Sequence, residues 1–218
     1  MEKIIAPSIL AADFSNLQSV CQMLNRSRAE WVHIDVMDGV FVPNISFGFP
    51  VLEAIKRHCV KTLDVHLMIR NPEKYIQRFR DAGADIITFH LETVDNPQNT
   101  IDLIRKSGAK VGVTINPNVP VAALTPVVKQ VDMALLMSVF AGFGGQKFIP
   151  ETFERVKELQ QIGSLQDAKF LIEIDGGICL DNAHALFDAG ANILVAGNCI
   201  FHSSDPTKTI DQLLNCKE

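Results

Sequence analysis

The chain lacks the features that mark membrane, nucleic-acid-binding and disulfide-rich proteins. None of its apolar runs reaches the roughly 18 residues that a membrane span requires. The net charge is −5 and no cluster of lysine and arginine stands out, which argues against a nucleic-acid partner. The five cysteines include no Cys-x-x-Cys pair. We therefore expect free thiols and a cytoplasmic protein without a membrane partner.

The chain also lacks an internal linker. No low-complexity or Gly/Ser/Pro-rich segment divides residues 1–218, so we expect a single domain. Short, almost continuously apolar runs alternate with longer amphipathic runs, a pattern typical of parallel strands buried on both faces. We predict strands over residues 3–8, 31–36, 62–68, 86–91, 110–115, 133–138, 169–175 and 193–197, and helices most clearly over 49–59, 72–82, 97–107, 150–162 and 180–189.

A short repeat marks several of these boundaries. Gly83, Gly108 and Gly190 each stand between a helical run and a strand, where glycine can take the left-handed conformation that ends a helix. Residues 27–30 contain no glycine, so the helix before residue 31 must end differently. Eight strand–helix units in 218 residues favour a (β/α)₈ TIM barrel. The competing doubly wound sheet usually has a glycine-rich first turn, which residues 8–13 lack.

Polar side chains occur at the ends of three predicted strands. His33 and Asp35 are two residues apart, so both face the barrel interior, while the residues between them face the helices. His66 ends the next strand in the same way, and Asp175 ends the seventh. The C-terminal ends of barrel strands carry the active site. Two histidines and two aspartates there favour a divalent metal site for Zn or Fe, or for Mn or Co. The alternative is a hydrogen-bonded polar layer without metal.

Other residues near the strand ends are less specific. Asp38 precedes a glycine and is interpreted as a turn residue, whereas His90 could add to the polar wall. Met37, Met68 and Met137 also lie near strand ends. Methionine in a core usually fills space. The alternative interpretation is that these three side chains form a layer of sulfur atoms beside a polar pocket.

Glycine clusters follow three adjacent strands. Glycine lets the backbone approach a ligand closely, and successive amide groups can bind an anion. Loops after the seventh and eighth strands form a recurrent phosphate site in barrels of this kind. We therefore predict a phosphate site whose donors are backbone amides. The residues are Gly142, Phe143, Gly144 and Gly145 after the sixth strand, Gly176 and Gly177 after the seventh, and Gly197 and Asn198 after the eighth.

Six motifs along the chain resemble those of one family. They are APSILAAD at 6–13, HIDVMDG at 33–39, FVPN at 41–44, DVHLM at 64–68, GFGGQ at 142–146 and DGGI at 175–178. Along essentially its whole length the chain resembles the ribulose-phosphate 3-epimerase family. The resemblance implies a (β/α)₈ barrel of the pentose phosphate pathway. Such an enzyme interconverts the phosphorylated ketopentoses D-ribulose 5-phosphate and D-xylulose 5-phosphate by two-base proton transfer at C3 through an ene-diolate.

The resemblance also implies roles for individual residues. His33, Asp35, His66 and Asp175 match the ligands of one divalent metal ion, and the two aspartates match the acid and base. Ser8 and His66 match substrate contacts. The glycine clusters match the phosphate site, and the three methionines match a sulfur-lined wall. We also expect a homo-oligomer.

The chain departs from the family pattern at two places. Phe140 and Ala141 stand where the family usually has Asn-Pro or Glu-Pro, and Asn198 follows Gly197 where serine is usual. These departures leave open a D-allulose-6-phosphate 3-epimerase. A barrel that decarboxylates or performs an aldol reaction is a further alternative, although no lysine ends the second or third strand. The remaining alternative is a non-catalytic sugar-phosphate binder.

Overall fold

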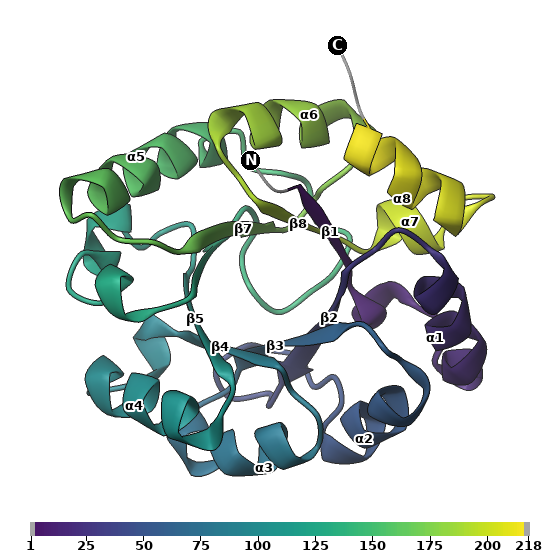
Figure 1. Ribbon diagram of the computed structural model, residues 1–218, viewed down its shortest axis with the longest axis horizontal. Coiled ribbons are helices and arrows are strands. Elements are labelled where there is room, and N and C mark those ends of the chain that lie inside the picture. Colours follow the sequence, from purple (N-terminus) through teal and green to yellow (C-terminus); the bar gives the residue numbers. More distant parts are fainter. Residues whose placement is uncertain (1–2, 216–218) are drawn as a thin grey trace.

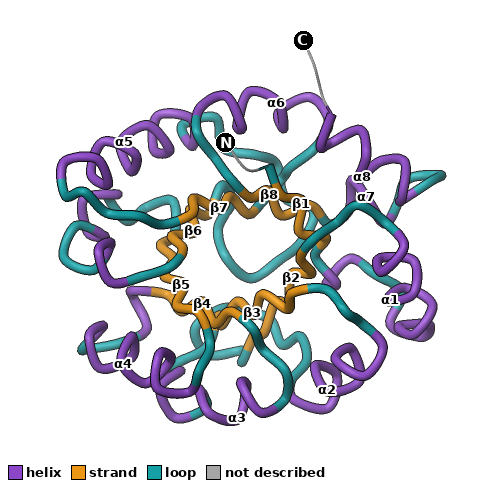
Figure 2. The backbone as a smooth tube through the Cα atoms, viewed as in Figure 1, coloured by secondary structure: helices purple, strands orange, loops and turns teal. Residues whose placement is uncertain are grey.

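The sheet is a barrel of eight parallel strands in a computed structural model that describes residues 3–215. Its strand order is β1-β8-β7-β6-β5-β4-β3-β2, and a parallel bridge between Ser8 and His33 brings the end of β1 against β2 (Figure 2). The predicted TIM barrel is therefore confirmed. The strands are β1 Ile4–Pro7, β2 Trp31–Met37, β3 Thr62–Met68, β4 Ile86–His90, β5 Lys110–Ile115, β6 Met133–Met137, β7 Leu171–Asp175 and β8 Ile193–Ala196.

Helices form an outer ring around this barrel (Figure 1). Between β5 and β6 the chain makes two 3₁₀ turns, Val121–Leu124 and Val128–Gln130, in place of an α-helix. In the described part of the chain, no helix is long and apolar enough to cross a membrane. The helices are α1 Leu17–Arg26, α2 Phe49–His58, α3 Ile76–Asp81, α4 Pro97–Ser107, α5 Thr152–Leu165, α6 Leu180–Ala189, α7 Asn198–Phe201 and α8 Pro206–Asn215.

The predicted element boundaries need two corrections. The helix expected over residues 72–82 is a 3₁₀ turn, Pro72–Lys74, followed by α3, because the backbone of Tyr75 leaves the helical region at φ −120°. The helix expected over 150–162 continues to Leu165, because Gly163 keeps a helical conformation against the Phe170 ring.

The helix ends follow the predicted glycine pattern. Gly83, Gly108 and Gly190 have φ values of 116°, 85° and 113°, in the left-handed region after α3, α4 and α6. Before β2, Ser27 replaces glycine: its hydroxyl donates to the carbonyl of Leu24 and accepts from the amide of Ala29. The side chain thus satisfies backbone groups that a glycine cap would otherwise satisfy.

The barrel interior is apolar at one end and polar at the other. Ile4, Trp31, Ile86, Met133 and Ile193 are the first residues of their strands, and they pack together as one buried cluster. Burying each such side chain contributes about 1.5–3 kcal/mol, whereas an unpaired charge at that depth would cost far more. The polar residues therefore lie beyond this apolar layer, from the middle of the barrel to the carboxyl ends of the strands.

Candidate active site

Four polar side chains meet at the carboxyl end of the barrel. His33 and Asp35 extend inward from β2, His66 from β3, and Asp175 from the last position of β7. One ligand atom from each of the four lies within 4.8 Å of the others. The alternation of side chains along β2 and β3 places them there, because the neighbouring residues face the helices. The structure thus brings together the four residues predicted as metal ligands.

His33 is held by a carboxylate that sequence reasoning missed. Its Nδ1 lies 2.6 Å from Asp64 Oδ2, and both side chains are buried. A carboxylate accepts hydrogen bonds, so Nδ1 carries a proton, and the nitrogen that faces Asp35 is Nε2. Burial would lower the pKa of His33, but the charges of Asp35 and Asp64 outweigh it and raise that pKa well above its usual value. That Nε2 makes no hydrogen bond to any described residue and lies 3.3 Å from Asp35 Oδ1. The signal for Asp64 was its place on the same strand face as His66.

Glu173 is a second buried acid that the sequence did not single out. Its side chain is fully buried, with one carboxyl oxygen 3.7 Å from His33 Nδ1. Burial, together with the charge of Asp64, raises the pKa of Glu173 well above its usual value. Burial therefore favours the neutral, protonated form of the Glu173 side chain.

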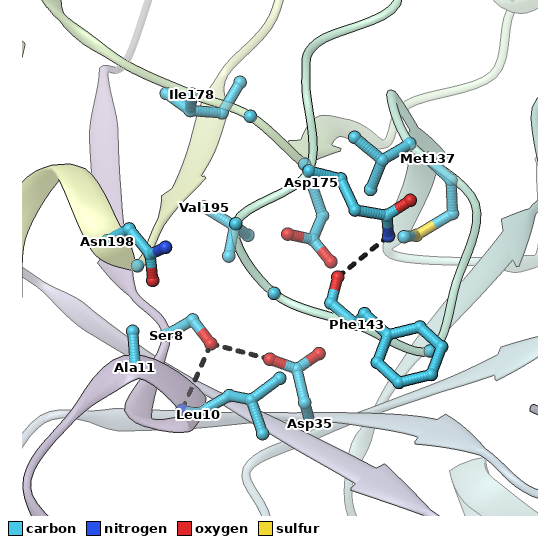
Figure 3. A pocket seen from close by; sticks show the side chains of 18 of the residues that line it. Ser8, Leu10, Ala11, Asp35, Met137, Phe143, Asp175, Ile178, Val195 and Asn198 are labelled. Carbon is cyan, nitrogen blue, oxygen red and sulfur yellow. Dashed lines mark hydrogen bonds between the residues drawn. The ribbon is translucent and has the colours of Figure 1, made fainter. Parts of the chain in front are cut away.

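Asp35 and Asp175 have opposite electrostatic environments. Burial alone would raise the pKa of Asp35, but His33 and His66 outweigh it and hold that pKa well below its usual value. Ser8 Oγ also donates to Asp35 Oδ2 over 2.6 Å (Figure 3). The side chain of Asp175 is 16% exposed, and burial and the Asp35 charge raise its pKa to about 6. Asp35 therefore stays ionised over the pH range in which Asp175 takes up and releases its proton, near pH 6.

The donor set fits a divalent metal ion. Two imidazoles and two carboxylates converge, and the unpartnered Nε2 of His33 points toward the carboxylates. Two acids this close disfavour each other's ionisation, as the raised pKa of Asp175 reflects, and a cation between them would remove that conflict. His33, Asp35, His66 and Asp175 could therefore hold a metal.

A cavity of about 370 Å³ lies over Asp35 and Asp175. In Figure 3 the two carboxyl groups point toward each other from different strands. His66 contacts Asp35 but is not among the described residues that line the cavity. The other residues predicted to contact substrate do line it: Ser8, Gly142, Phe143, Gly144, Gly145, Gly176, Gly177, Gly197 and Asn198, together with Met37, Met68 and Met137.

The glycine-rich loop after β6 is held over this cavity by side chains that sequence reasoning missed. Gln146 Nε2 donates to the carbonyls of Phe140 and Phe143, and Asn44 Nδ2 donates to the carbonyl of Gly142. His202 is exposed and also lines the cavity. Asn44 belongs to the FVPN motif at residues 41–44, and its place in that motif could have pointed to a role at the site.

Asp38 and the cysteines behave as predicted and lie outside this chemistry. Asp38 accepts hydrogen bonds from the amides of Val40, Phe41 and Arg70, which makes it a turn residue that joins two loops. The cysteines in the described part of the chain are free thiols: Cys21, Cys59, Cys179 and Cys199. Cys216 lies outside the described residues.

The chain is similar to known proteins over nearly its whole length. The model of the ribulose-phosphate 3 epimerase family matches residues 4–201. Ribulose-phosphate 3-epimerase from Bacillus subtilis (strain 168) is 43% identical over 214 residues, covering 98% of this chain and 99% of that protein. The Synechocystis enzyme of the same name is 43% identical over 216 residues, covering 98% and 94%. Among solved structures, a mutant tryptophan synthase α-subunit from Pyrococcus furiosus superposes with a TM-score of 0.74 at 17% identity, covering 98% of this chain and 99% of that one, which shows the barrel fold alone. The chain belongs to the ribulose-phosphate 3-epimerase family.

Proposed function

We propose that the chain interconverts D-ribulose 5-phosphate and D-xylulose 5-phosphate by moving a proton at C3. Family membership makes it an isomerase of the pentose phosphate pathway. The observation that carries the mechanism is the pair Asp35 and Asp175, which extend from β2 and β7 toward one cavity (Figure 3). A homo-oligomer and a cytoplasmic location stay predictions.

The two aspartates suit proton transfer on opposite faces of the substrate. The hydrogen at C3 lies next to the C2 ketone, so its removal leaves a planar ene-diolate. With its low pKa, Asp35 is ready to accept a proton, while the raised pKa of Asp175 suits it to donate one. In the reverse direction the two exchange roles. Ser8 orients the Asp35 carboxylate through its 2.6 Å hydrogen bond.

His33, Asp35, His66 and Asp175 would hold one divalent ion, and this mixed nitrogen and oxygen set suits Zn, Fe, Mn or Co. When bound, the ion supplies positive charge beside the oxygens on which negative charge develops. Asp64 holds a proton on His33 Nδ1, so Nε2 is the nitrogen that would lose its proton and bind the ion. On the cavity wall, Met37, Met68 and Met137 offer an apolar surface without acidic protons.

Backbone amides of three loops would bind the phosphate. None of the described residues that line the cavity is a lysine or arginine, so main-chain N–H groups would be the main donors, beside side chains such as that of Asn198. The three loops are closely packed. A Cβ on Gly145 would lie 2.6 Å from Asn198 Nδ2, and one on Gly177 would lie 2.5 Å from the amide nitrogen of Phe148. Glycine at these positions lets the loops approach each other and a bound anion.

The reaction itself tests the proposal. In deuterated water we expect D-ribulose 5-phosphate to become D-xylulose 5-phosphate with deuterium at C3. Unphosphorylated D-ribulose should have a kcat/KM at least ~100-fold lower, roughly the ~3 kcal/mol of a few charge-assisted hydrogen bonds. D-allulose 6-phosphate is the control for substrate choice. Release of carbon dioxide, or phosphate-dependent binding without C3 exchange, would refute the assignment.

A matched pair of glycine variants tests the phosphate site. Gly177 has φ +64°, and an added Cβ would collide with the Phe148 backbone, so Gly177→Ala should displace the loop after β6. We expect its KM for D-ribulose 5-phosphate to rise about tenfold, roughly one to two lost amide contacts. Gly48→Ala is the control: Gly48 does not line the cavity and no atom lies within 4 Å of the new Cβ, so KM should stay near wild type.

The rate on unphosphorylated D-ribulose separates phosphate binding from general damage. A phosphate-specific defect lowers the preference for the phosphorylated sugar, whereas misfolding lowers both rates together. Equal losses on the two substrates in Gly177→Ala would argue against a phosphate site in these loops.

A further inference from the structure

A row of polar side chains connects the loop after β6 with His66, and none of them takes part in the proton transfers described above. The Ala141 amide donates to Asn116 Oδ1 over 3.0 Å, and Asn116 Nδ2 donates to Glu92 Oε1 over 3.0 Å. Glu92 Oε2 lies 3.6 Å from His90 Nδ1, and His90 Nε2 lies 2.9 Å from His66 Nε2. The row therefore ends on a side chain of the candidate metal site.

At the loop end of the row, the Asn116 side-chain amide can take only one orientation. A backbone amide can only donate, so the Ala141 contact fixes Oδ1 of Asn116 toward the loop and Nδ2 toward Glu92. The backbone N–H of Asn116 also donates to Glu92 Oε1 over 3.0 Å. Both donors therefore use the same carboxylate oxygen, and Oε2 is left buried without a hydrogen-bond partner among the described residues.

The histidine pair can be arranged in two ways, and Glu92 distinguishes them. If His90 carries its proton on Nδ1, that N–H points to Glu92 Oε2, and Nε2 accepts from His66. If the proton is on Nε2, the Nδ1 lone pair faces the carboxylate and Oε2 stays unpaired. The second arrangement gains the 3.5 Å contact between Asn116 Nδ2 and His90 Nδ1, and it lets His66 Nδ1 donate to Asp35 Oδ1 over 3.2 Å. Asp35 already accepts from Ser8, whereas Glu92 Oε2 has no other partner among the described residues, and an unpaired buried oxygen costs about 1–3 kcal/mol. This difference favours the first arrangement.

The first arrangement also has a consequence for His66. With His90 Nε2 as acceptor, His66 donates from Nε2, and its Nδ1 is directed to the metal site, 3.2 Å from Asp35 Oδ1 and 3.8 Å from Asp175 Oδ2. A metal ligand must offer a lone pair, so Nδ1 has to be free of its proton when an ion binds.

We propose that Glu92 and His90 are positioning residues that hold His66 in the tautomer with Nδ1 available to a metal ion. Asn116 and the Ala141 amide orient Glu92 from the other side. The proposal rests on the proposed function, because it assigns a task to residues next to the metal site. A merely structural cluster would pack equally well with either tautomer, since both place the same heavy atoms at the same positions.

The metal-free wild-type protein gives the first test and needs no variant. Long-range proton–nitrogen correlation spectra report which ring nitrogen of each histidine carries a proton. We expect His90 to be neutral, with its proton on Nδ1. A proton on Nε2 of His90 would overturn the proposal, because that nitrogen could no longer accept from His66.

Glu92→Gln gives the second test, since it replaces one carboxylate oxygen by NH₂ at nearly constant volume. If the amide carbonyl keeps accepting from Asn116, the NH₂ group faces His90 Nδ1 and reverses the pair. We expect the His90 proton on Nε2 and a 10–100-fold weaker affinity for Zn²⁺ alone, the usual effect of losing such a partner. Affinity is measured by competition with a chromophoric chelator. Glu53→Gln, exposed on α2, is the matched control and should bind Zn²⁺ as the wild type does.

The outcomes separate this proposal from the proposed function. A wild type that binds no Zn²⁺ and does not epimerise contradicts the proposed function, while the His90 tautomer still reports on the row. A wild type that does both, beside a Glu92→Gln variant with unchanged Zn²⁺ affinity and unchanged tautomer, overturns the positioning role alone. Should the variant fail to fold, the wild-type tautomer decides.

Discussion

Removing divalent metal from the protein should lower epimerisation by at least ~10³-fold, because a metal ion supplies several kcal/mol of charge stabilisation and each ~1.4 kcal/mol is a factor of ten. The reason lies in the site itself. Asp35 and Asp175 face one small volume, and the Asp35 charge helps raise the pKa of Asp175 to about 6. Without a cation, further negative charge on the substrate would add to this repulsion.

The measurement is turnover of D-ribulose 5-phosphate after exhaustive chelation, with the residual metal determined by elemental analysis. Zn, Mn, Fe or Co should restore activity, whereas Mg should restore little, because imidazole nitrogens are poor ligands for it. A thermal melt of the metal-free protein controls for unfolding. Full activity in protein that contains less than about a hundredth of an equivalent of metal would show that His33, Asp35, His66 and Asp175 form a metal-free polar layer.

The candidate metal ligands could be predicted because strand geometry is local. Side chains alternate along a strand, so the spacing of His33 and Asp35 places both inside the barrel whatever the neighbouring strands do. The same reasoning applies to His66. Asp175 follows from its place at the end of a predicted strand. Function could be predicted further than geometry alone allows, because the motifs around these residues are specific to one family.

The partners of these ligands could not be predicted, because they depend on register between strands. His33 lies opposite Asp64 only because β2 and β3 pair in one of several possible registers. The contact between His66 and His90 requires the register of β4 against β3 as well. Spacing within a single strand contains no information on such offsets. The contact of Ala141 with Asn116 joins two loops, and loop conformation is specified less by local pattern than by packing.

Separate exchange of the two epimers is the result expected if Asp35 and Asp175 act on opposite faces of the substrate. Asp35→Asn and Asp175→Asn each remove one proton carrier at constant volume. Loss of a positioned acid or base costs about 10²–10⁴-fold, so overall epimerisation should fall by at least that factor in either variant. Asp167→Asn, exposed in the turn between α5 and β7, is the matched control and should keep wild-type activity.

Each aspartate is also a candidate metal ligand, so the metal content of both variants has to be measured first. Only a variant that keeps its metal reports on proton transfer. In such a variant the remaining carboxyl group can still remove and return the C3 proton on its own face. One epimer should therefore exchange its C3 hydrogen with deuterated solvent without being converted, and the partner variant should exchange the other epimer.

The positions of the two aspartates make this result sensitive to the assignment. Asp35 extends from β2 and Asp175 from β7, so neither can replace the other without a change in the face that exchanges. If both metal-loaded variants exchange the same epimer, the two aspartates do not serve opposite faces. If one variant epimerises near the wild-type rate, another group carries that proton. His66 would then be the residue to test, because its Nδ1 lies 3.2 Å from Asp35 and 3.8 Å from Asp175.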